Sequence, residues 1–146
     1  MGRFLFSLIL ALASTVIHVE SLTKFHIGGQ LICALDKKFI YVITLFEWDT
    51  LFDDNISPLT TGRGHWTGNF HFEGQDNWDG LWDNFFELYM GITHNCNKGG
   101  VLPYRTYRFH MGDFLINDGE YTRSYSINIT NAGFEDKLVF GNISHG

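Results

Sequence analysis

The sequence predicts an all-β fold, a sandwich of two sheets with one disulfide, and three observations support this prediction. After the amino-terminal segment, runs of alternating apolar and polar residues are separated by Gly, Asn and Asp, and no helix-length stretch has a 3.6-residue repeat. Two of these runs have a cysteine on the apolar side. The chain contains 14 Phe and 2 Pro, and 45% of its residues are hydrophobic, so it has enough apolar area for a core.

The first 21 residues have the pattern of a secretory signal peptide. Arg3 precedes an almost wholly apolar run at residues 4–17, and small and polar residues follow. The run of about 14 residues is short for a helix that must cross roughly 30 Å of hydrocarbon, and an uncleaved anchor is the alternative. We expect cleavage after Ser21, with Ala13 as the second candidate, and a single exported domain at residues 22–146.

The two cysteines are predicted to form a disulfide through the core. In residues 25–33 the odd positions are apolar or glycine and include Cys33. In residues 88–96 the even positions include Cys96 and are apolar except for His94, which we expect to be a packed core residue. An even pair of cysteines in an exported chain predicts a bridge. Because packed sheets lie about 10 Å apart, only inward side chains can meet.

Three further runs show the same alternation, at residues 68–74, 104–110 and 124–130. The histidines of these runs, His71 and His110, fall on the predicted solvent faces. The residues expected to face the core are Phe70, Phe72, Tyr107, Phe109, Tyr125, Ile127 and Ile129.

Residues 39–48 differ because they are apolar on both faces. Val42, Phe46 and Trp48 lie opposite the face that carries Ile43. Such a strand is either covered by a helix, for which the sequence offers no candidate beyond a short turn, or forms an exposed patch that meets a partner.

A second group of candidate anchors lies in a polar, Gly-containing stretch that is typical of a loop. Trp78, Leu81 and Trp82 either act there as rigid anchors for a partner or fold back over the open end of the sandwich. The candidate partner-binding residues are therefore Val42, Phe46, Trp48, Trp78, Leu81 and Trp82.

Three Asn-x-Ser/Thr sequons are candidate glycosylation sites. They begin at Asn55, Asn128 and Asn142, and Pro58 directly follows the first. Asn128 falls on the solvent face of its predicted strand, where a glycan is tolerated.

Charge and residue spacing argue against several classes of function. The net charge is −6 and stays −6 without residues 1–21, which disfavours nucleic acid as a partner. His65 and His71 do not have the spacing of a metal-binding pair, and the acidic clusters at residues 47–54 and 76–83 do not match the calcium-loop pattern. We interpret the clusters as solvated turns, expect a turn at residues 53–55, and expect neither a metal nor a cofactor.

Four short motifs occur along the chain at residues 27–33, 45–54, 68–74 and 92–97. In kind and order they resemble those of the nematode transthyretin-like family, and the resemblance extends over residues 22–135. It implies a transthyretin-like sandwich of seven or eight strands in a secreted protein. The family commonly has two further cysteines that are absent here, and residues 102–104 stand where the first would be.

We expect an extracellular binding protein whose partner is a protein, a lipid or a small lipophilic ligand. The resemblance also suggests a second function, a carrier of small lipophilic molecules at the interface of a homo-oligomer. A third is hydrolysis of 5-hydroxyisourate, as in the enzymatic relatives of transthyretin. Those enzymes end in Tyr-Arg-Gly-Ser, whereas this chain ends in Gly-Asn-Ile-Ser-His-Gly, so we expect no catalytic residues.

Overall fold

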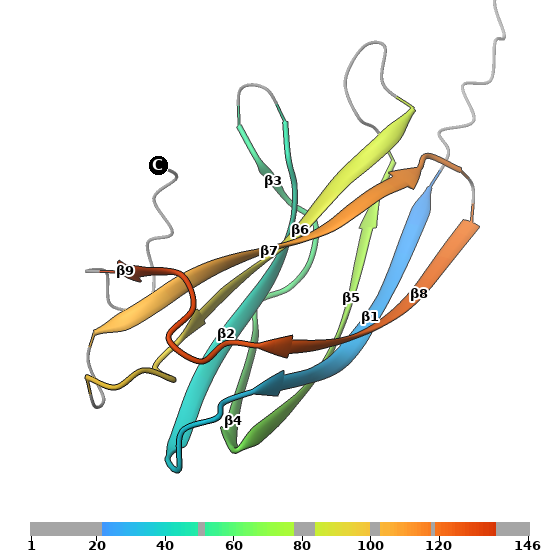
Figure 1. Cartoon of the computed structure of the whole chain (residues 1–146). Helices are drawn as coiled ribbons and strands as arrows, with labels where there is room; N and C mark the ends of the chain where they lie inside the picture. Colours follow the sequence, from blue (N-terminus) through green and yellow to red (C-terminus); the bar gives the residue numbers. More distant parts are fainter. Residues whose placement is uncertain (1–21, 50–51, 78–83, 100–102, 118, 137–146) are drawn as a thin grey trace, which may run out of the picture.

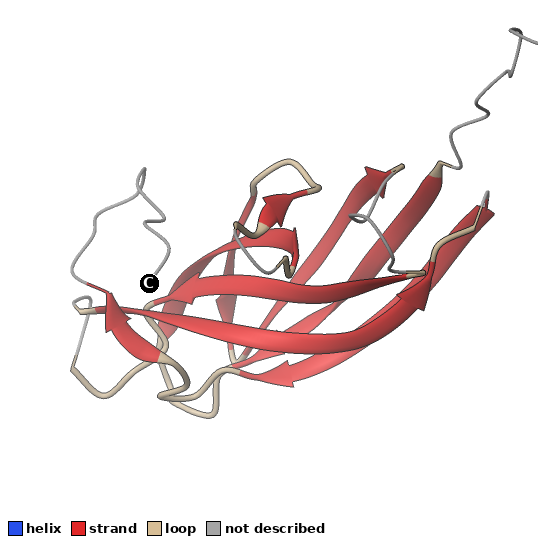
Figure 2. Ribbon diagram, turned by 90° about the horizontal axis from the view of Figure 1, so that it is seen from above, coloured by secondary structure: helices blue, strands red, loops and turns tan. Residues whose placement is uncertain are grey.

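The computed structural model describes residues 22–49, 52–77, 84–99, 103–117 and 119–136. Over these ranges the fold is all-β (Figures 1 and 2). No helix in the described part of the chain could span a membrane. The strands are β1 (Thr23–Ile32), β2 (Lys38–Glu47), β3 (Asp54–Asn55), β4 (Thr60–His65), β5 (Thr67–Asp76), β6 (Phe85–His94), β7 (Tyr104–Leu115), β8 (Gly119–Asn128) and β9 (Phe134–Asp136).

The nine strands of the described ranges exceed the seven or eight that the family resemblance implies. The additional ones are the very short β3 and β9. A strand of two or three residues is too short to show an alternating pattern, so the sequence contains no signal for it. Residues 54 and 55 pair with β2, which corrects the expectation that residues 53–55 are only a turn.

The strands form two layers in the order β8-β1-β5-β4-β2-β6-β7-β9, with β3 beside β2. The layers meet between β4 and β5, which share the single residue pair His65–Thr67. One layer therefore contains β8, β1 and β5, and the other contains β4, β2, β6, β7 and β9. All pairs are antiparallel except β1 with β8, which is parallel. This arrangement confirms the predicted β-sandwich.

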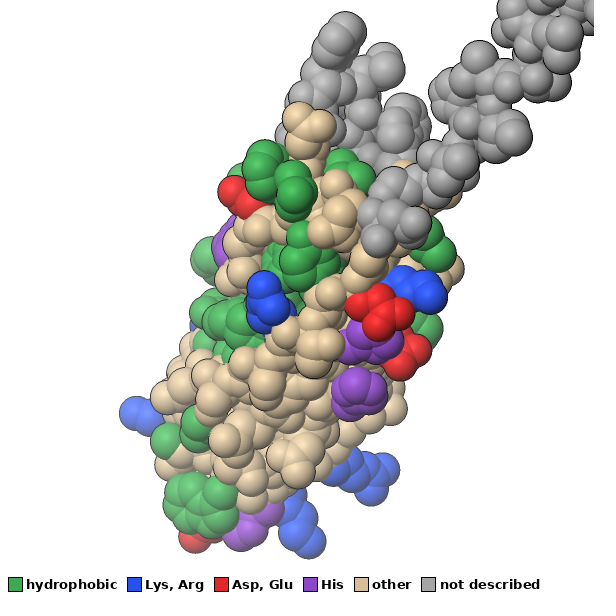
Figure 3. Space-filling view, turned by 90° about the vertical axis from the view of Figure 1, so that its right-hand side faces the viewer, with side chains coloured by type: hydrophobic (Ala, Val, Ile, Leu, Met, Phe, Trp, Pro, Cys, Tyr) green, Lys and Arg blue, Asp and Glu red, His purple; other side chains and the backbone are tan. Residues whose placement is uncertain are grey.

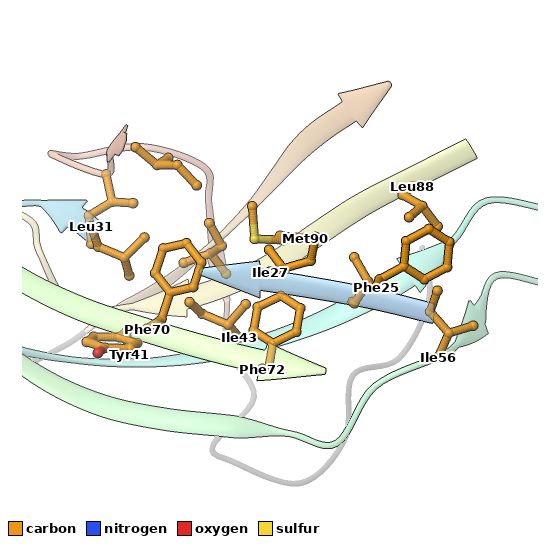
Figure 4. Close-up of a cluster of buried hydrophobic side chains, with 14 of the residues drawn as sticks. Phe25, Ile27, Leu31, Tyr41, Ile43, Ile56, Phe70, Phe72, Leu88 and Met90 are labelled. Atoms are coloured by element: carbon orange, nitrogen blue, oxygen red, sulfur yellow. The ribbon is translucent and has the colours of Figure 1, made fainter. Parts of the chain in front are cut away.

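The core lies between the layers and consists of the inward side chains of the alternating strands. Figure 4 shows side chains of β1 and β5 packed against those of β2 and β6. Phe25 makes edge contacts with Phe86 and Phe114, with ring centroids 5.7 and 5.6 Å apart. The predicted inward residues Phe70, Phe72, Ile127 and Ile129 are buried, while Tyr107, Phe109 and Tyr125 are partly buried because β7 and β8 lie at or beside the sheet edges.

The predicted disulfide is confirmed. Cys33 follows β1 and Cys96 follows β6, so the bridge joins the two layers at one end of the sandwich. Both cysteines are completely buried and their Cα atoms are 5.9 Å apart. The bridge closes a loop with a sequence separation of 63, which stabilises a fold by about 4 kcal/mol on the chain-entropy model.

Candidate partner-binding surface

The outer face of β2 is covered by its own sheet rather than exposed. Val42 lies between Thr61 of β4 and Thr93 of β6 and is 6% exposed. Phe46 is 5% exposed, whereas Trp48, just beyond the strand, is 52% exposed. The expectation of an exposed apolar strand is therefore wrong for Val42 and Phe46 and right for Trp48.

Phe46 is buried because the neighbouring strand leaves room for its ring. A Cβ atom at Gly91 of β6 would lie 2.9 Å from that ring, so only glycine allows this close approach. The Phe46 ring also stacks on Tyr89 of β6, with centroids 5.2 Å apart. Two side chains of adjacent strands thus cover each other on the outside of the sheet.

Tyr89 is the centre of a group of aromatic and ionic side chains on this face. Its hydroxyl donates a hydrogen bond to Oδ2 of Asp53 over 2.5 Å. The guanidinium of Arg108 from β7 lies 5.0 Å from the centre of the Tyr89 ring and 3.8 Å from the same Asp53 oxygen. Burial and the Asp53 hydrogen bond raise the pKa of Tyr89, with Arg108 acting against them, so the hydroxyl remains a neutral donor.

The group extends across three strands. The His110 ring on β7 lies 6.0 Å from the Tyr89 ring and 5.8 Å from the Trp48 ring. Figure 1 shows β2, β6 and β7 side by side, which brings these residues together. We call this surface the outer aromatic cluster; its members are Phe46, Trp48, Asp53, Tyr89, Arg108 and His110.

Tyr89, Asp53 and Arg108 were not among the residues predicted from the sequence. A signal existed, because Tyr89 and Gly91 occupy the outward positions of the run at residues 88–96. A large ring and a glycine two positions apart leave space for a neighbour's side chain. The pairing of β2 with β6, which supplies that neighbour, is visible only in the structure.

Several predicted site residues lie elsewhere. Asn55 and Asn128 are exposed, as a glycan acceptor must be, and their Oδ1 atoms accept hydrogen bonds from the amides of Ser57 (3.2 Å) and Thr130 (3.0 Å). The remaining candidates fall outside the described residues: Trp78, Leu81, Trp82 and Asn142.

The histidines are distributed as predicted. His71 and His110 are exposed, and His94 is completely buried beside the disulfide. Nδ1 of His94 accepts a hydrogen bond from the amide of Cys96 over 3.2 Å. Burial lowers the pKa of His94 to about 4; the Ala132 carbonyl acts against this and Arg105 adds to it, so the ring is neutral. Among the described residues, no three His, Cys, Asp or Glu side chains are placed to hold a metal ion.

Comparison with known proteins identifies a nematode relative. Over 83 residues the chain is 30% identical to the uncharacterized protein B0416.7 of Caenorhabditis elegans. The matched part covers 57% of this chain and 63% of that protein, so the chain spans less than two thirds of the relative's length. No protein-family model matches the sequence.

Proposed function

We propose that this chain is a secreted, extracellular binding protein with a transthyretin-like fold, and that it contacts a partner protein through the outer aromatic cluster. Three observations support the first half of the proposal. The four sequence motifs occur in the family's order, the chain is a two-layer sandwich, and a relative exists in a nematode. The leader-like first 21 residues and the core disulfide favour export, because disulfides persist in oxidising compartments.

The half-exposed Trp48 is the observation that most favours the outer aromatic cluster as the contact surface. Tryptophan, tyrosine and arginine are the residues that most often dominate binding energy at protein interfaces. All three types meet here, and Phe52 in the segment after Trp48 is 77% exposed. Exposed apolar rings that adjoin other apolar side chains are typical of surfaces at which proteins bind partners.

The central side chain of the cluster, Tyr89, is already held in place without a partner. Tyr89 is 3% exposed and is held by the hydrogen bond to Asp53 and the ring of Phe46. Side chains that are already ordered lose little conformational entropy when they bind. Arg108 remains 44% exposed, so its guanidinium is available to a carboxylate at the edge of an apolar contact.

A capture experiment with matched variants tests the proposal. The oxidised, secreted protein is immobilised and exposed to secretions of the natural source, and bound proteins are identified by mass spectrometry. The variant W48S/F52S removes the exposed ring of Trp48 in the cluster and that of Phe52, which precedes the cluster residue Asp53 in the sequence. The control W66S/F134S removes a tryptophan and a phenylalanine that are 47% and 87% exposed on other strands or turns.

We expect a specific partner to be retained by the wild type and by W66S/F134S, and to be lost from W48S/F52S. Equal capture by all three proteins would show that the contact surface lies elsewhere. Sedimentation velocity of the same proteins tests whether the partner is a second copy of this chain, because W48S/F52S alone would then become monomeric.

A further inference from the structure

A second site lies at the other end of β2, on the same outer face. Here the surface is hollowed by a cavity of about 390 Å³ between β2 and β4. The nearest β2 residues of the two sites, Ile40 and Phe46, are six positions apart, or roughly 20 Å of extended chain. The residues that line the cavity are Lys38, Phe39, Ile40, Arg63, Gly64 and His65.

The strand register brings basic side chains together around an apolar one. Lys38 pairs with His65, and Ile40 pairs with Arg63, in the antiparallel ladder of β2 and β4. Alternate residues of a strand share a face, and directly opposed residues have Cβ atoms about 5 Å apart. Lys38, Arg63 and His65 therefore surround the half-buried Ile40.

Two of these three basic groups are not neutralised. His65 is paired with Asp36, with 2.9 Å between Nε2 and the carboxylate oxygen. The side chains of Lys38 and Arg63 have neither a hydrogen bond nor an ion pair with another described residue. In a chain of net charge −6, two adjacent unpaired cations form a local positive potential that attracts an anion. At the lower end of Figure 3, blue Lys and Arg side chains lie beside a purple histidine.

An exposed aromatic ring in an unusual conformation lies next to His65, one of the residues that line the cavity. Trp66 follows β4 and is 47% exposed, and the centroid of its ring lies 5.7 Å from that of the His65 ring. Its φ angle is 67°, a value that bulky residues rarely adopt. The Trp66 carbonyl accepts a hydrogen bond from the amide of Cys33 over 2.8 Å, so the turn is anchored to the start of the disulfide loop.

We propose that this cavity binds a small organic anion: a carboxylate, sulfonate or phosphate attached to a compact apolar group. The anionic group would lie between Lys38 and Arg63, since a guanidinium can donate two parallel hydrogen bonds to such oxygens. The apolar group would contact Ile40, the stems of the two basic side chains and Trp66. The cavity volume falls in the range of small-molecule sites. This site is independent of the proposed protein contact.

Three soluble probes separate the contribution of the anionic group to binding from that of the apolar group. Naphthalene-2-sulfonate has the anionic and the apolar group, sodium sulfate has only the first, and 2-naphthalenemethanol has only the second. Binding to the oxidised, secreted protein is measured by calorimetry and by amide chemical shifts, which locate the probe. We expect naphthalene-2-sulfonate to bind at least about tenfold more tightly than either other probe, and to shift the amides of Lys38, Arg63 and Gly64.

Matched charge variants show whether Lys38 and Arg63 are responsible for the binding of the anion. K38Q/R63Q should weaken naphthalene-2-sulfonate binding about tenfold or more, since it removes both charged donors. The control K24Q/R123Q removes the same charge from β1 and β8 and should leave binding unchanged. If both variants weakened binding equally, the effect would be due to the net charge of the protein, and the proposal would be overturned.

Other outcomes would also overturn it. Equal binding of sodium sulfate would remove the apolar requirement, and equal binding of 2-naphthalenemethanol would remove the anionic one. Flotation with phosphatidylserine and phosphatidylcholine vesicles tests a membrane source of the anion. Binding to phosphatidylserine vesicles without binding of soluble naphthalene-2-sulfonate would identify a lipid surface in place of a small ligand.

Discussion

Over residues 41–47, the two faces of β2 are buried to nearly the same extent but by different means. On the inner face, Tyr41 and Ile43 are 3% and 0% exposed because the opposite sheet covers them. On the outer face, Val42 and Phe46 are 6% and 5% exposed because side chains of adjacent strands in the same sheet cover them. Low exposure therefore does not distinguish the core of this protein from a layer of side chains at its surface.

The difference matters for both stability and binding. An inner side chain is enclosed from all directions, so its removal leaves a cavity that the structure fills only partly. An outer side chain borders solvent, so water and neighbouring side chains occupy the space that it leaves. The outer face can therefore accommodate changes in a binding surface at lower cost to the fold.

The largest expected effect on the free energy of unfolding comes from truncating two neighbouring residues that lie on opposite faces of β2. Ile43→Ala should lower the free energy of unfolding by about 3 kcal/mol, because it creates a cavity in the core. Val42→Ala should lower it by only about 1 kcal/mol, because the outer layer relaxes. Urea denaturation of the two oxidised variants measures both values. Equal losses would mean that the outer face is as enclosed as the core.

A pH titration compares an inner and an outer histidine. The pKa of His94 is lowered from 6.5 to about 4, so below pH 6.5 the unfolded chain binds a proton that the folded ring does not accept until about pH 4. Stability should fall by about 2 kcal/mol between pH 7.5 and 5 through this residue alone. The fall is measured by thermal or urea unfolding across that range.

Substitution separates this contribution from other titrations. His94→Gln should remove most of the decline, whereas His110→Gln on the exposed outer cluster should leave it unchanged. A decline of the same size in His94→Gln would assign the pH dependence to other groups.

The smallest expected effect on the free energy of unfolding comes from one hydrogen bond on the outer face. Tyr89→Phe keeps the ring beneath Arg108 but removes the hydroxyl that donates a hydrogen bond to Asp53. This substitution should lower the free energy of unfolding by about 1 kcal/mol. Tyr107→Phe is the control, since the Tyr107 hydroxyl has no hydrogen bond within the described residues. Equilibrium unfolding that shows equal costs for both variants would mean that the Asp53 bond does not hold the cluster together.

Prediction from the sequence was most successful where one face of a strand is apolar and the other polar. Phe70 and Phe72 with His71 between them, and Ile127 and Ile129 around Asn128, lie as the alternation requires. It failed for the outer side of β2, where an apolar residue next to a partner strand and an apolar residue in solvent have the same sequence pattern. Gly91, distant in sequence, decides that Phe46 is covered.

The sequence by itself determined the all-β class, the inward faces of the long strands and the two cysteines that join them, because each depends on a two-residue period within one segment. Only the tertiary structure decided which strands are neighbours. That choice placed Tyr89 and Arg108 beside Phe46, and Arg63 beside Lys38. Both candidate surfaces combine side chains from separate strands, and such contacts arise from sheet pairing, which no local pattern encodes.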